Sequence, residues 1–155
     1  MIPPLLPLPP GEGGSEGKRR DGLTIVLDTN IILDVFVFND QAAETIRQSL
    51  AANSLNWLAT HPMRDELARV LAYPKIVQRL NFYALTAQSV LQKFDQHAQL
   101  VAAAPKASLT CKDADDQKFI DLAVHHCALL ISKDQHVLSM QKRLLAQGIR
   151  VQTAI

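Results

Sequence analysis

The sequence predicts an α/β fold in which a mostly parallel sheet carries helices on both faces. Short apolar runs alternate with segments of helical periodicity along the chain, a pattern typical of strand–helix–strand units. Hydrophobic residues make up 48% of the chain but aromatic residues only 5%, which suits helices packed on an aliphatic sheet. With 155 residues, the chain is long enough for one domain whose core needs no disulfide or metal for stability.

The first 21 residues differ in composition from the rest. They hold five of the eight prolines and four of the six glycines, and they end in a basic run before Asp21. We therefore expect residues 1–21 to be a Pro/Gly-rich tail without a catalytic role and residues 22–155 to be the domain. The tail lacks the basic start and uninterrupted apolar core of a signal peptide, so we expect a cytoplasmic protein.

The elements follow in order from residue 24. Apolar runs predict strands, and helical periodicity between cap residues predicts helices, at 24–27 (strand), 41–51 (helix), 55–59 (strand), 61–73 (helix), 75–80 (helix), 84–98 (helix), 100–104 (strand), 116–127 (helix), 129–131 (strand), 137–146 (helix) and 149–153 (strand). Asp40 or Asn39 can cap the first helix, and Thr60 can cap the second. Pro74 ends the second helix, and Gly148 suits the left-handed position after the last one.

Four acidic residues fall at comparable points of this pattern. Asp28 ends the first strand, Glu66 lies in the first turns of the helix after the second, and Asp134 follows the fourth. The carboxyl ends of parallel strands share one edge with the starts of the helices that follow, so these three are expected together. Asp116 opens the helix that leads into a strand. We expect it at the opposite edge unless the loop 105–115 crosses back over the sheet.

If the four carboxylates converge, their charges favour a bound cation. Carboxylates a few ångströms apart disfavour joint ionisation, whereas Mg²⁺ or Mn²⁺ accepts such an all-oxygen ligand set. The cation could lower the pKa of a bound water and stabilise charge on a phosphoryl oxygen, which suits phosphodiester hydrolysis. Asn30 and Ser132 would then support the ligands or position the substrate.

Each carboxylate also has a simpler interpretation. Asp28 could belong to an Asx turn, and Asp134 to an ordinary turn. Asp116 could be a plain helix cap, and Asp113 and Asp115 are near enough in sequence to take either role. Glu66 could simply favour the start of its helix through the helix dipole.

The ordered set of motifs resembles the PIN-domain nucleases. Asp28-Thr29-Asn30 after a hydrophobic strand is similar to their opening motif, and Glu66 is similar to their second acidic position. Asp116 and Asp134, which stand 18 residues apart, resemble the third and fourth. The resemblance covers about residues 23–155. Ser132 stands where threonine is more usual, and the N-terminal tail is not a feature of the family.

The resemblance implies a compact three-layer α/β/α sandwich with a negatively charged pocket for Mg²⁺ or Mn²⁺. It also implies that the helix start at Asp116 faces this pocket. Small bacterial members of similar size include VapC-like toxins of toxin–antitoxin pairs. The resemblance to these implies an endoribonuclease that dimerises and is held inactive by an antitoxin protein.

The charge balance of the chain and the identity of Asn30 help to weigh alternative functions. Sixteen basic residues against fifteen acidic ones argue against a strongly basic nucleic-acid binder but allow a local basic rim. Residues near the acidic positions that could contact RNA phosphates are Arg64, Arg69, Lys112, Lys118 and Lys133.

A non-catalytic PIN-like module that binds RNA or protein is one alternative. An aspartyl phosphohydrolase with Asp28 as nucleophile is another, although it would need an acid where Asn30 stands.

Overall fold

The computed structural model describes residues 22–155, so the tail expected at 1–21 and its boundary with the domain lie outside the described residues. One sheet organises the described part, and all its strand pairs are parallel, in the order β3-β2-β1-β4-β5. The strands are β1 (Leu23–Leu27), β2 (Leu55–Ala59), β3 (Ala98–Leu100), β4 (Leu129–Ile131) and β5 (Val151–Gln152). The order reverses at β1, and such a point is where open α/β sheets commonly bind ligands.

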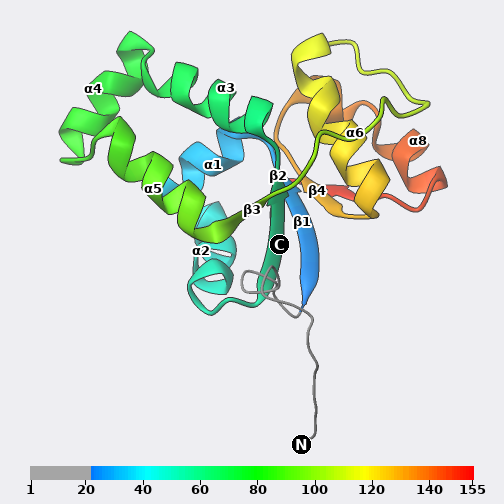
Figure 1. Cartoon of the computed structure of the whole chain (residues 1–155), viewed down its shortest axis with the longest axis horizontal. Coiled ribbons are helices and arrows are strands. Elements are labelled where there is room, and N and C mark those ends of the chain that lie inside the picture. Colours follow the sequence, from blue (N-terminus) through cyan, green and yellow to red (C-terminus); the bar gives the residue numbers. More distant parts are fainter. Residues whose placement is uncertain (1–21) are drawn as a thin grey trace, which may run out of the picture.

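Helices cover both faces of this sheet, as predicted. Figure 1 shows α1 to α5 on one side of the strands and α6 and α8 on the other. The helices are α1 (Thr29–Phe36), α2 (Glu44–Ala51), α3 (His61–Leu71), α4 (Pro74–Phe82), α5 (Ala87–His97), α6 (Gln117–His126), α7 (Gln135–Leu138) and α8 (Gln141–Ala146), with 3₁₀ turns η2 (Gln41–Ala43) and η3 (Ala114–Asp116). The three-layer α/β/α fold class is confirmed.

The central strands are buried on both faces, which explains why their sequences are continuous apolar runs. Val26 and Leu130, which pair with each other, are fully buried. On the side of α5, Trp57 of β2 meets Phe94 edge to face, with ring centroids 5.1 Å apart. None of the helices in residues 22–155 is long and apolar enough to cross a membrane.

Three element predictions needed correction, each through a contact that local periodicity does not show. Residues 29–36 form the mostly buried helix α1, which was not expected, and the Asp28 side chain caps it by accepting from the Ile31 amide. β3 starts and ends earlier than expected, because pairing with β2 places Ala98 opposite Trp57. The single helix expected at 137–146 is two helices, which meet around Met140.

Candidate functional site

Asp28 lies at the carboxyl end of the central strand and is 3% exposed. One carboxylate oxygen accepts from the Ile31 amide at 3.0 Å, and the other accepts from the Ser132 hydroxyl. Ser132 is fully buried after β4, and its oxygen also accepts from the Asp134 amide at 3.1 Å. Burial raises the pKa of Asp28, because it removes the carboxylate from water. The hydrogen bonds from Ser132 and Ile31 offset this effect only in part.

Asp116 and Asp134 form the second part of the site. Asp134 caps α7 by accepting from the His136 amide at 2.8 Å. Burial and the nearby Asp134 carboxylate raise the pKa of Asp116 to about 7, with smaller contributions from Asp113 and Asp28. Asp116 Oδ2 is buried and has no hydrogen-bond partner among the described residues. A buried carboxylate oxygen without a donor, near two further carboxylates, is a suitable ligand for a cation.

Spacing alone favoured the opposite edge of the sheet for Asp116 unless the loop 105–115 crossed back, whereas the resemblance to PIN domains implied that this helix start faces the pocket. The structure agrees with the second expectation. Helix α6 leads into β4, but it also follows β3 and runs antiparallel to the strands, so its first turn lies near their carboxyl ends. The electrostatic effects of Asp28 and Asp134 on Asp116 agree with this placement. Asp113 instead caps η3 by accepting from the Asp115 amide, and the Asp115 side chain is exposed.

Glu66 is held differently from the three aspartates. It lies on α3, and its two carboxylate oxygens accept from different donors: the Thr29 hydroxyl at 2.5 Å and the Lys118 ammonium. Thr29 is the first residue of α1, directly after Asp28, so this hydrogen bond joins Glu66 to the motif at the end of β1. All four predicted acidic residues therefore border one region of the sheet edge, and among residues 22–155 Glu66 is the one of the four that forms a salt bridge there.

Several basic residues near the site are already paired. Lys133 forms a salt bridge with Asp34, a buried residue of α1, and Arg64 contacts Asp95 through two hydrogen bonds of 2.7 and 2.8 Å. Arg69 and Lys112 are exposed. Asn30 is exposed in the first turn of α1.

The chemistry of the donor set suits a hard divalent cation, although the side chains do not enclose one in their present positions. Within residues 22–155, no three His, Cys, Asp or Glu side chains are arranged so that they could hold a metal ion as they stand. The unpaired Asp116 oxygen and the mutual effects of the aspartates nevertheless fit Mg²⁺ or Mn²⁺.

Thr29, Asp34 and Lys118 are the site residues that sequence reasoning did not place. Thr29 stands inside the opening motif, but its hydrogen bond spans 37 residues of sequence. Lys118 was predicted only as a residue that contacts phosphate, and its salt bridge spans 52 residues. No local pattern signals either contact. The sequence shows only that Glu66 is acidic and Lys118 is basic, and their helices α3 and α6 come together only in the folded chain.

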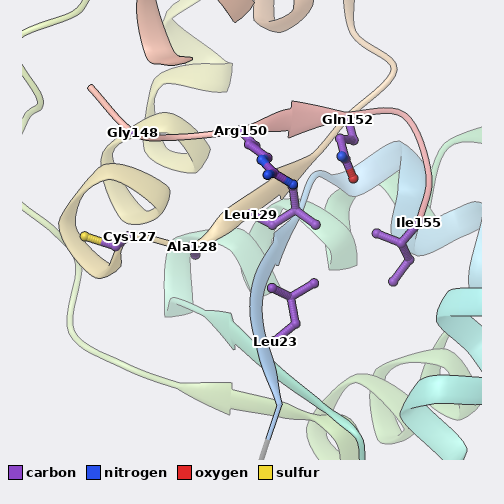
Figure 2. A pocket seen from close by; sticks show the side chains of 8 residues that line it. All are labelled: Leu23, Cys127, Ala128, Leu129, Gly148, Arg150, Gln152 and Ile155. Carbon is purple, nitrogen blue, oxygen red and sulfur yellow. The ribbon is translucent and has the colours of Figure 1, made fainter. Parts of the chain in front are cut away.

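A well-formed cavity of about 330 Å³ lies away from the carboxylates. Figure 2 shows the residues around it, which come mainly from the starts of β1 and β4 and from the segment before β5. Leu23, Leu129 and Ile155 give it apolar walls, and Arg150 is its charged residue. Its lining holds no carboxylate side chain, so it differs in chemistry from the acidic edge of the sheet.

Asp116→Asn is expected to stabilise the metal-free protein at pH 8. The folded state raises the pKa of Asp116, so it binds a proton more tightly than the unfolded chain, and stability is lost as pH rises towards 7. Asparagine removes that loss. A shift from 3.8 to about 7 corresponds to about 4 kcal/mol before solvent screening, and because the side chain is partly exposed we expect about 1 kcal/mol.

Urea unfolding in EDTA at pH 4 and pH 8 measures this gain, which should shrink at the lower pH. Asp115→Asn is the matched control, since the neighbouring side chain is exposed and should leave stability unchanged. A less stable Asp116→Asn protein at pH 8 without metal would contradict the electrostatic description of the site.

Comparisons with known proteins agree with this architecture. Residues 24–136 match the PIN domain family. One chain of the crystal structure of VapBC2 from Rickettsia felis bound to a DNA fragment from their promoter has a similar fold, with a TM-score of 0.57 and 16% sequence identity. The similarity covers 83% of this chain and 98% of that one. Comparison with curated proteins gives no match. The family match spans most of the chain and includes all four acidic positions, and the chain therefore belongs to the PIN domain family.

Proposed function

We propose that this PIN-domain protein is a metal-dependent endoribonuclease that hydrolyses RNA phosphodiester bonds. The observation that carries the proposal is the buried, unpaired oxygen of Asp116 beside Asp28 and Asp134, at the carboxyl ends of the strands. Asp134 and Asp28 both raise the pKa of Asp116, and such close carboxylates favour a divalent cation over joint ionisation without one. The predicted acidic set also includes Glu66, on the other side of Thr29.

Asp28, Asp116 and Asp134 would hold the cation, and their supports are already present. The Ser132 hydroxyl and the Ile31 amide fix both oxygens of Asp28, while the His136 amide fixes Asp134. When bound, Mg²⁺ or Mn²⁺ would supply positive charge for a phosphoryl oxygen and acidify water. Asn30 is exposed at the same edge and would donate hydrogen bonds from its amide to the RNA backbone.

The biological setting is a further part of the proposal. The fold resembles a chain of the VapBC2 complex, which supports a role as the toxin of a toxin–antitoxin pair with an antitoxin protein as partner. We also propose that the chain forms a homodimer and acts in the cytoplasm. Cys111 and Cys127 are not joined in a disulfide, which fits a reducing compartment.

Metal removal provides the direct test. The purified chain is expected to cleave a mixed RNA pool in Mg²⁺ or Mn²⁺, and EDTA should abolish the cleavage until the cation is restored in excess. Gel electrophoresis of end-labelled RNA follows internal cleavage. Cleavage that continues unchanged in EDTA would overturn the metal mechanism. Binding of RNA without any cleavage would favour the non-catalytic PIN-like module, and phosphate release with a labelled Asp28 would favour the phosphohydrolase.

A further inference from the structure

Glu66 differs from the three aspartates because a cation of the chain itself neutralises it. Its Oε1 accepts from the Lys118 ammonium and its Oε2 accepts from the Thr29 hydroxyl. The two side chains of the ion pair are only 25% (Lys118) and 19% (Glu66) exposed, so water screens the attraction less than at an open surface. Glu66 thus has no need of a second positive charge.

Lys118 is held in place by more than this ion pair. Its ammonium also donates to the backbone carbonyl of Asp115. The same group lies 4.9 Å from the centre of the Phe119 ring, a cation–π distance. Lys118 follows Asp116 by two residues, so the turn that presents the unpaired carboxylate also fixes the lysine. A side chain restrained from three directions is costly to displace.

The three aspartates have no comparable partner. Within residues 22–155, Asp28 accepts hydrogen bonds from neutral donors, the Ser132 hydroxyl and the Ile31 amide. Lys133 lies close enough to lower the pKa of Asp28, but its ammonium forms its salt bridge with Asp34. Asp116 keeps an oxygen without a donor in the described part of the chain. Negative charge without compensation is therefore concentrated on the aspartate side of the site.

We propose that Lys118 is a positioning residue that keeps Glu66 out of the metal ligand set, so that the site binds a single divalent cation on the aspartate side. The inference rests on the proposed metal-dependent function. The ammonium occupies the place where a second cation would neutralise Glu66. A second ion bound there would have to displace it or bear its repulsion at short range. Glu66 then serves to hold the Thr29 hydroxyl and Lys118 rather than the metal.

Mn²⁺ binding to the full chain, followed by electron paramagnetic resonance of the free ion, separates the roles of the carboxylates. The wild type is expected to bind about one Mn²⁺ per chain, against about two in a two-metal site. Asp116→Asn should weaken binding by more than about 100-fold, whereas Glu66→Gln should weaken it by no more than about tenfold. Lys118→Met should admit a second ion beside Glu66, and Lys142→Met, an exposed control, should change nothing.

The possible outcomes separate a failure of this inference from a failure of the proposed metal-dependent function. Loss of Mn²⁺ binding in Glu66→Gln to the same extent as in Asp116→Asn would make Glu66 a ligand and overturn the inference alone. A wild type that takes two ions, or a Lys118→Met protein that still takes one, would do the same. A wild type that binds no Mn²⁺ would overturn the metal-dependent function as well.

Lysine acylation provides a measurement on the wild-type protein, so its result does not depend on whether a variant folds. Acetic anhydride labelling of the wild type, followed by mass spectrometry of peptides, reports how accessible each ammonium is. We expect Lys118 to be equally protected with and without Mn²⁺, relative to exposed Lys142 in the same sample. Labelling of Lys118 that rises severalfold with Mn²⁺ would show that the metal displaces it from Glu66, and it would overturn the inference.

Discussion

Asp28→Asn is expected to reduce RNA cleavage at least about 100-fold while the protein stays folded. Asparagine keeps the shape of the side chain and an oxygen that can still accept from the Ile31 amide, so the cap of α1 survives. Its amide nitrogen can donate to the Ser132 oxygen in place of the present contact. The substitution therefore removes the charge and leaves the local geometry, which is the change that a metal site tolerates least.

The measurement is the initial rate of cleavage of a defined RNA in saturating Mg²⁺, with circular dichroism to confirm the fold. Asp40→Asn is the matched control, because Asp40 caps η2 by accepting from the Ala42 amide at 2.9 Å and is not one of the four site carboxylates. It should cleave at the wild-type rate. Equal rates for Asp28→Asn and wild type would mean that the charge at the end of β1 takes no part in the chemistry.

The sequence predicted the fold and the edge where the carboxylates meet because both depend on local patterns. A buried apolar run that ends in Asp28, and helices that begin near Glu66 and Asp134, are visible in single segments. Parallel pairing then brings these ends to one edge. Spacing alone did not decide whether Asp116 joins them, because that depends on the direction of α6 relative to the sheet; only the resemblance to PIN domains implied its place at the pocket.

The arrangement inside the site could not be predicted in the same way. Whether Glu66 faces a metal or a lysine depends on the contact between α3 and α6. The two residues that meet there, Glu66 and Lys118, are 52 residues apart in the sequence. The same holds for Asp34 of α1, because its salt-bridge partner Lys133 comes much later in the sequence, just after β4. These pairs form only when the two helical layers close over the sheet. They determine which carboxylates keep free charge, and hence where a cation can bind.

Phe94→Ala is expected to lower the free energy of unfolding by about 3–5 kcal/mol, the largest stability effect among the substitutions considered. Phe94 has no exposed surface, and its ring packs edge to face on Trp57, which lies at 5.1 Å in β2. Truncation removes the ring and leaves a cavity between α5 and the sheet that the rigid strand cannot fill. In a chain of this size, a loss of that magnitude should lower the Tm by about 10 °C.

Trp57 makes the measurement direct, because it is the only tryptophan of the chain and is 1% exposed. Urea unfolding followed by its fluorescence reports the layer that Phe94 supports. Phe82→Ala is the matched control, since that ring is 79% exposed on α4 and its loss should cost less than about 0.5 kcal/mol. If the two substitutions destabilise the protein equally, then α5 is not packed on β2 as described. The site edge, which depends on that layer for the position of α3 and Glu66, would then have to be placed differently.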